Sequence, residues 1–443
     1  MKAIVNRIVS NWTGQYRNNL LLKRLTTILG IDILVKASGF ILLPIYLRLM
    51  TQEEYGLYNY LLSIITTFAI VLNFGLYVPL SKFYHDCKTE KEKGTLLFTI
   101  FSLLIVLLIL IVAPVYLFRL DFPLTLILFK NSIQYNSYRI IVLLALLMTV
   151  FSFMLTNFFY TSEKITIVKR YNLTRIIGIN LITLAALIYI DKDAVQTRIQ
   201  FTYLSELLIF LVFVGSLIRE FYNHFDSKLA LTALRMGLPI MISAIFGIII
   251  NFSDKFFLEK YGSLRELSNY YLAFSFASII PTIFASLQNV WVPLFMKEKD
   301  LRVNLQKTNR LVFRLTWIFL IIGVAMWVCF RILLITGIIP RKYAEVSYIL
   351  PILLITQIIA SLAPLFSNYL IYFHKTFSVS VAGLVACGIS VGLGLILVPA
   401  WGVYGAALVN LSSNLFYLIV FYLLVKYYAN RHLINLNSEI VQA

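Results

Sequence analysis

Charged side chains are scarce in this 443-residue sequence, because Asp, Glu, Lys and Arg together make up 13% of it. A soluble domain usually contains about 25% of these residues. Apolar residues make up 60%, and the mean hydropathy is +0.86. One water-solvated core could not hide so much apolar surface. The composition therefore excludes a soluble globular protein and predicts an all-α protein that crosses a membrane many times.

Cysteine is also rare, and Cys87, Cys329 and Cys387 lie far apart without a nearby histidine. The sequence has no P-loop, H-E-x-x-H or G-x-S-x-G motif, and its loops are too short for a soluble catalytic domain. We therefore predict no disulfide framework, no metal site, no cofactor and no catalytic residues. Transport would then draw on an ion gradient or on the gradient of the substrate itself.

Acidic residues are fewer than basic ones, 20 against 38, which gives a formal net charge of +18. In a soluble protein such an excess would suggest a nucleic-acid partner. Membrane proteins instead hold surplus Lys and Arg in their cytoplasmic loops. We therefore interpret the charge as a mark of topology and predict no nucleic-acid partner.

Apolar runs of about 20 residues are long enough to cross the hydrocarbon core as helices. Twelve such runs occur, and the spans that they predict are 26–48, 57–80, 95–118, 139–161, 173–190, 199–218, 236–256, 268–292, 311–335, 346–372, 377–398 and 402–425. Lys and Arg number 24 on the side of the two termini and 12 on the other side. This bias predicts that both termini are cytoplasmic.

An internal repeat indicates how the spans are grouped. EEYGLYNYLL at 53–62 resembles RELSNYYLAF at 265–274, about 212 residues later. This displacement carries the second span onto the eighth, which predicts two parallel six-helix lobes with a cavity between them. The expected domains are a basic cytoplasmic segment (1–24), an N-lobe (25–218), a C-lobe (219–430) and a cytoplasmic tail (431–443).

Charges within apolar spans are costly and usually face a partner or a wet cavity. Asp32 and Lys36 lie one helical turn apart in the first span, with Lys36 about 16 Å past its cytoplasmic end at 1.5 Å per residue. The two side chains share a helix face and can pair. They form either a structural ion pair or a cavity-lining pair that touches substrate or a coupling ion.

Four further charged residues are site candidates. Arg175 lies a few residues inside the fifth span and either contacts substrate or reaches the cytoplasmic headgroups. Glu206, deeper in the sixth span, is either a proton or sodium site or a partner-bound structural residue. Asp254 and Lys255 end the seventh span and are candidates for a gate or for an interfacial anchor.

Uncharged amides recur at membrane depth, and some of them are expected to hydrogen-bond across helices. They are Asn73, Asn157, Asn251, Gln288, Asn289, Gln357, Asn368, Asn410 and Asn414. Tyrosine is abundant, with 27 residues, and most are expected in the interfacial belts.

Three segments resemble a known family. LPIYLRLMTQEEYGLYNYLLSI (43–64) with FGLYVPLSKFYHD (74–86) is similar to the opening of bacterial polysaccharide flippases, the O-antigen transporter family. MGLPIMISAIFGIIINFSDKFFLEKYGSLRELSNYYLAF (236–274) and VPAWGVYGAALVNLSSNLFYLIVFYLLV (398–425) resemble its seventh, eighth and last helices. The family belongs to the multidrug/oligosaccharidyl-lipid/polysaccharide (MOP) exporter superfamily, which also contains multidrug extruders (MATE) and lipid II flippases.

The resemblance implies a MATE-like fold of twelve helices that moves an undecaprenyl-pyrophosphate-linked oligosaccharide to the outer leaflet of the bacterial cytoplasmic membrane by alternating access. Cationic cavities are typical of the family, and Lys36, Arg175 and Arg48 are the residues here that would contact the diphosphate. The implied partners are this lipid-linked substrate, membrane lipids, H⁺ or Na⁺, and a polysaccharide polymerase machinery. The alternatives are a MATE-type drug antiporter and a membrane polysaccharide polymerase or ligase.

Overall fold

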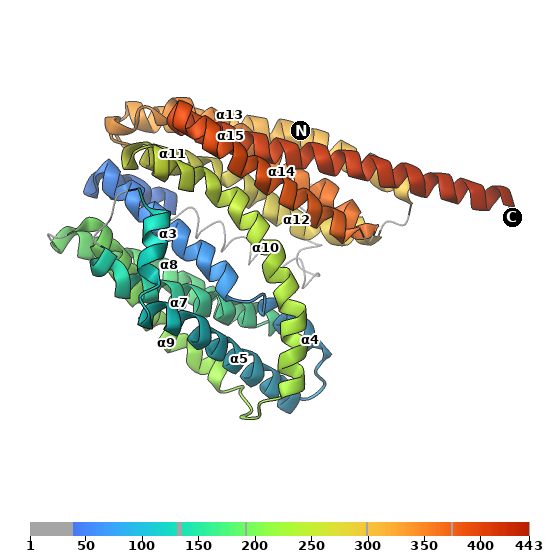
Figure 1. Ribbon diagram of the computed structural model, residues 1–443, viewed down its shortest axis with the longest axis horizontal. Coiled ribbons are helices and arrows are strands. Elements are labelled where there is room, and N and C mark those ends of the chain that lie inside the picture. The colour runs from blue at the N-terminus through green and yellow to red at the C-terminus, as the bar shows by residue number, and fades with distance from the viewer. Residues whose placement is uncertain (1–38, 131–134, 191–192, 298–299, 374, 443) are drawn as a thin grey trace, which may run out of the picture. The chain divides into compact units, whose positions relative to one another are not determined.

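The computed structural model describes residues 39–130, 135–190, 193–297, 300–373 and 375–442. Within these residues the regular secondary structure is helical, as Figure 1 shows. A short apolar helix, Gly39–Leu49, comes first. The later elements are α3 (Gln52–Leu72), α4 (Tyr77–Asp86), α5 (Glu90–Leu117), α6 (Asp121–Leu128), α7 (Tyr135–Thr161), α8 (Ile165–Tyr189), α9 (Ala194–Ile218), α10 (Ser227–Tyr261), α11 (Leu264–Ala277), α12 (Ile279–Lys297), α13 (Leu301–Ile335), η1 (Arg341–Tyr343), α14 (Val346–Tyr372) and α15 (Thr376–Gln442).

Ten helical segments of the described chain are long and apolar enough to cross a membrane, and one of them, Leu264–Gln288, contains α11 and the first part of α12. Two of the predicted spans, 377–398 and 402–425, lie within α15, where Gly402 has a non-helical φ of 52° that separates two helical parts. Most of the predicted span 26–48 lies outside the described residues, and its last part forms the helix Gly39–Leu49. The chain is therefore a multi-span helical protein.

The predicted span 57–80 is not one helix. α3 ends at Leu72, and α4 begins at Tyr77 after a turn in which Phe74 and Gly75 have positive φ. A Cβ atom on Gly75 would lie 2.3 Å from the carbonyl oxygen of Gly237. A side chain cannot fit there, so glycine meets both the left-handed backbone and the close approach to α10.

The predicted span 268–292 is also interrupted, because α11 ends at Ala277 and α12 begins at Ile279. Pro281 has no N–H to donate to the carbonyl of Ala277, which weakens the helix at this point. The hydroxyl of Ser278 donates to the carbonyl of Ser275 beside the break. α11 begins with a capping box, in which Ser263 and Glu266 satisfy the first free amides.

Two compact units can be distinguished by their internal contacts. Unit 1 contains the described chain up to Leu49, Leu72–Ala113 and Ser137–Leu238, and unit 2 contains Met50–Val71, Pro114–Asn136 and the chain from Pro239 onward. Within unit 1, α8 packs against α9. Within unit 2, α14 packs against α11, α12, α13 and α15. The lobes over 25–218 and 219–430 stay a prediction.

Candidate functional site

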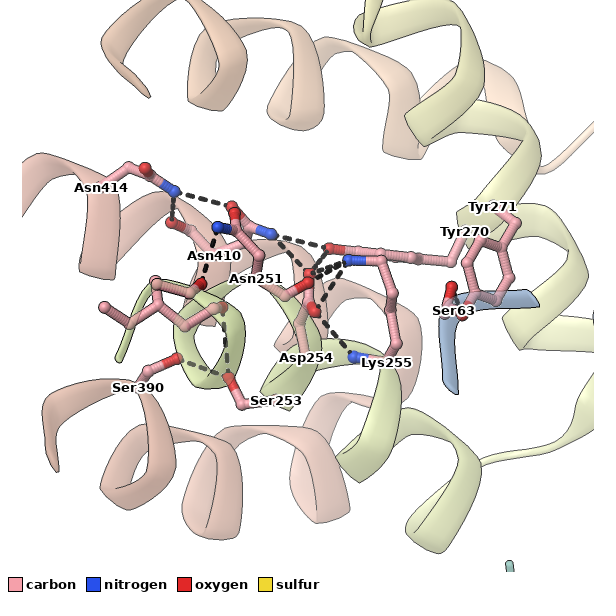
Figure 2. A network of polar contacts seen from close by, with 12 residues as sticks. Ser63, Asn251, Ser253, Asp254, Lys255, Tyr270, Tyr271, Ser390, Asn410 and Asn414 are labelled. Atoms are coloured by element: carbon pink, nitrogen blue, oxygen red, sulfur yellow. Dashed lines mark hydrogen bonds and ion pairs between the residues drawn. The ribbon is translucent and has the colours of Figure 1, made fainter. Parts of the chain in front are cut away.

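A buried polar network in unit 2 joins three helices around Asp254 of α10 (Figure 2). The hydroxyl of Tyr270, from α11, donates to one carboxylate oxygen of Asp254. The amide of Asn410, from α15, donates to the same oxygen at 2.5 Å. Asp254 and Tyr270 are fully buried, and Asn410 is 2% exposed. The network therefore holds a buried carboxylate of the candidate span Ser227–Tyr261 with hydrogen bonds from two other helices.

Lys255 supplies the positive charge of this network. Its ammonium lies 3.1 Å from Asp254 Oδ1 and donates to the carbonyl of Asn251 at 2.6 Å. It also lies 4.5 Å from the ring centroid of Phe274, a favourable cation–π distance. α10 continues for six residues beyond Lys255, to Tyr261, and the position of the pair near the outer interface stays a prediction. The pair is buried and its charges are mutually compensated.

A second acid–base pair lies in unit 1. Arg175 of α8 donates from Nη2 to Glu206 Oε1 of α9 at 2.5 Å. The Glu206 side chain is 6% exposed, while that of Arg175 is 32% exposed. The guanidinium also lies 5.4 Å from the ring centroid of Tyr171. The two predicted candidates thus form one pair, whose cation is partly open and whose anion is buried.

The other predicted substrate contacts are Asp32, Lys36 and Arg48. Asp32 and Lys36 fall outside the described residues, so their pairing stays a prediction. Arg48 is exposed and lies one residue before the end of the helix Gly39–Leu49.

The two segments of the internal repeat pack against each other within unit 2. The hydroxyl of Tyr271, in α11, donates to Ser63 Oγ of α3 at 2.7 Å. The amide of Gln52 donates to Asn269 Oδ1 at 3.1 Å. A Cβ atom on Gly56 would lie 2.2 Å from the carbonyl oxygen of Leu264, so glycine allows the two backbones to approach closely. We call this contact the α3–α11 seam.

The short helix η1 and the start of α14 close one end of the α3–α11 seam. The Gln52 amide also donates to the carbonyl of Lys342 at 2.6 Å, and the Lys342 ammonium donates to the carbonyl of Met50 at 2.7 Å. The Asn269 amide donates to Glu345 Oε2 at 2.8 Å. Partial burial lowers the pKa of the Lys342 ammonium, and the negative charge of Glu54 opposes this shift.

An apolar pocket of about 520 Å³ lies between α13, α14 and α15 of unit 2. Ile355, Leu362, Phe366 and Leu423 are among the residues that line it. Such a lining offers little to orient a charged headgroup. Across the described residues, no three metal-ligating side chains lie together.

Comparison with known proteins identifies the family. The sequence profile of the family described as "Polysaccharide biosynthesis protein" matches residues 21–298, which is more than half of the chain. The chain belongs to the polysaccharide biosynthesis protein family. This confirms the resemblance that the sequence motifs indicated. A search of curated proteins finds no match.

Solved structures show the same fold at low sequence identity. The chain is similar to "Lipid II flippase MurJ, inward closed conformation", with a TM-score of 0.68, 16% identity, and coverage of 89% of this chain and 87% of that one. It is also similar to a multidrug resistance MATE family transporter of the MOP superfamily in its inward-facing conformation, with a TM-score of 0.62, 13% identity, and coverage of 91% and 94%. The fold is therefore that of the MATE and MurJ transporters, as predicted.

Sequence reasoning missed how the candidates are connected. Glu206 and Arg175 were separate predictions, and the structure makes them one pair. The prediction that some of the nine amides hydrogen-bond across helices is confirmed for Asn410, although the sequence did not indicate its partner, Asp254. Tyr270 and Tyr271 carried no signal beyond their place in the repeat. That repeat was the available clue, because it marked the two segments that pack together.

Proposed function

We propose that this protein is a flippase that moves an undecaprenyl-pyrophosphate-linked oligosaccharide, such as an O-antigen repeat unit, from the inner to the outer leaflet of the bacterial cytoplasmic membrane. The observation that carries the proposal is the family match over residues 21–298, together with a fold shared with transporters. Charged pairs buried at membrane depth support it, since such groups usually serve transport pathways. The protein acts as a carrier and not as an enzyme.

In this proposal the chain crosses the membrane twelve times, in two six-helix lobes, with both termini in the cytoplasm. The kink at Gly402 supports counting α15 as two spans, and the helix Gly39–Leu49 supports a first span. Cysteines at Lys91 and Arg341 test the orientation, because both positions are exposed. After Cys87, Cys329 and Cys387 are replaced, an impermeant thiol reagent outside intact cells should label Arg341→Cys and spare Lys91→Cys. The reverse pattern would invert the topology.

Transport proceeds by alternating access, with the α3–α11 seam as part of the outer closure. The seam depends on a glycine contact and a few hydrogen bonds, which are weak enough to open during a transport cycle. Arg175 contacts the diphosphate, because its guanidinium is partly open and can form bidentate bonds with phosphate. Lys36, Asp32 and Arg48 stay proposed cavity residues.

Glu206 couples transport to H⁺ or Na⁺ by binding the ion. Its carboxylate can do so because it loses its partner when the guanidinium of Arg175 turns to the substrate. Asp254 and Lys255 serve the gate, because their network ties α10 to α11, one of the helices of the α3–α11 seam. A polysaccharide polymerase machinery would receive the flipped product.

A MATE-type drug antiporter is the second candidate, since MATE transporters share the fold. Deletion of the gene distinguishes the two functions. A flippase mutant should accumulate lipid-linked glycan on the cytoplasmic leaflet and lose the surface polysaccharide, and plasmid-borne wild type should restore both. An unchanged glycan pool, combined with a new sensitivity to cationic drugs, would contradict the flippase and support the antiporter.

A further inference from the structure

Four buried polar atoms along the contact of α12 with α14 have no hydrogen-bond partner among the described residues. They are Gln288 Oε1, Trp291 Nε1, Ser361 Oγ and Asn368 Nδ2. Ser361 is 2% exposed and Asn368 is 6% exposed, while Gln288 and Trp291 are partly exposed. We call this group of four side chains the polar strip.

The register of the two helices places these four residues close together. The chain through α11 and α12 runs in the same direction as α14, because Asn269 of α11 contacts Glu345 at the start of α14, and Phe295 of α12 packs edge-on against Tyr369, at 4.7 Å between ring centroids, near the end of α14. Gln288 lies seven residues before Phe295, and Leu362 lies seven residues before Tyr369. Gln288 is therefore level with Leu362 and with its neighbour Ser361. The polar strip thus extends over two helical turns, or about 10 Å.

One face of α14 carries its half of the polar strip. Tyr372 contacts Phe295 of α12, and Asn368 and Ser361 lie four and eleven residues before it, on the same helix face. Pro364 lies between them and cannot donate to the carbonyl of Ala360, which leaves a further acceptor in this stretch. Trp291 packs onto the apolar cluster that contains Phe295 and Tyr369.

Unpaired buried polar groups destabilise a fold, and nearly all such groups in proteins have partners. Four of them in one stretch are explained if another molecule supplies the partners during the working cycle. The helix break at Ser278 lies directly before α12, which gives this helix a point at which it can move relative to α11. Opening of the α12–α14 contact would then expose the polar strip.

We propose that the polar strip binds the saccharide part of the transported substrate, an inference that rests on the proposed function. A saccharide offers hydroxyl groups that both donate and accept, which matches an amide oxygen, an amide N–H, an indole N–H and a hydroxyl. The strip has no charge, so it suits the sugar and not the pyrophosphate. The flat indole of Trp291 can cover an apolar sugar face.

The experiment exploits the opposite effects that a binding role and a structural role have on stability. Ser361→Ala and Asn368→Leu remove unpaired groups, so each should keep or raise the thermal unfolding midpoint of the purified protein. Lipid-linked oligosaccharide extracted from the deletion strain should bind each variant about fivefold more weakly than wild type, the effect of one hydrogen bond. Trp291→Phe, which keeps an aromatic ring but lacks the N–H, should weaken binding similarly.

Two controls make the result specific. Ser413→Ala removes a buried hydroxyl that is already bonded to the carbonyl of Val409, and it should leave binding of the oligosaccharide unchanged. Undecaprenyl pyrophosphate without sugar should bind wild type and all strip variants equally.

The outcomes separate the inference from the proposed function. Wild-type affinity for the oligosaccharide in all three strip variants would overturn the saccharide site while leaving the flippase intact. A lower unfolding midpoint in both Ser361→Ala and Asn368→Leu would show structural hydrogen bonds and also overturn it. Failure of wild type to bind either lipid would instead count against the flippase.

Discussion

Two acid–base pairs within candidate membrane-spanning helices have opposite surroundings. In unit 1, the carboxylate of Glu206 is 6% exposed and meets one donor on the neighbouring helix, Arg175, whose side chain is 32% exposed. In unit 2, Asp254 is fully buried and Lys255 is 6% exposed, and the carboxylate also accepts from Tyr270 and Asn410. The first pair has an open side, whereas the second is enclosed by three helices.

The difference indicates different roles for the two pairs. Removing one partner of an enclosed and fully bonded charge pair strongly destabilises the fold, because the other charge stays buried without compensation. Such a pair therefore fixes the packing of the helices that supply it. An open pair can exchange partners with a solute, because the guanidinium is already partly outside the protein. We therefore expect stability to depend mainly on Asp254, and substrate handling to depend mainly on Arg175.

The largest expected effect is that of Asp254→Ala, which leaves the Lys255 ammonium buried without its counter-charge. Breaking a buried pair in this way costs about 3–5 kcal/mol of folding free energy. The thermal unfolding midpoint and the yield of monodisperse protein should both fall sharply. The double variant Asp254→Ala with Lys255→Met should recover part of the loss, since no lone charge remains. A wild-type midpoint for Asp254→Ala would contradict the enclosed network.

A smaller loss is expected for Glu206→Gln. Arg175 then loses its charged acceptor, but its open side allows water or lipid headgroups to solvate the guanidinium. We expect a loss of about 1–3 kcal/mol, the typical cost of removing one hydrogen-bond partner from a buried polar group. The same unfolding measurement checks this value. A loss as large as that of Asp254→Ala would remove the distinction between the two pairs.

The smallest effect concerns the α3–α11 seam. Tyr271→Phe removes the hydrogen bond to Ser63 and should cost about 1 kcal/mol. A double-mutant cycle with Ser63→Ala should show coupling of similar size, because the two groups contact each other directly. Additive effects would show that the hydrogen bond contributes nothing, and the seam would then depend on the glycine contact at Gly56 and on the hydrogen bond from Gln52 to Asn269.

The sequence predicted most of the helices but few of the contacts. The span predicted from hydropathy, 346–372, has the same first and last residues as α14 (Val346–Tyr372), because a continuous apolar run marks a span directly. Hydropathy missed the break after Leu72, which depends on a turn at Phe74 and Gly75 and leaves the apolar pattern unchanged. Partners such as Asp254 and Asn410 lie 156 residues apart, and hydropathy carries no information about such pairs.

Movement of the substrate across a bilayer is the central claim, and reconstitution tests it most directly. Purified protein is placed in vesicles together with radiolabelled lipid-linked oligosaccharide extracted from the deletion strain, and an impermeant glycosidase is added outside. Wild-type vesicles should lose the label from both leaflets, and protein-free vesicles from the outer leaflet alone. Arg175→Gln should slow the loss of label from the inner leaflet, while the protein remains folded. Protection of the inner leaflet in wild-type vesicles, with and without a proton or sodium gradient, would contradict the account.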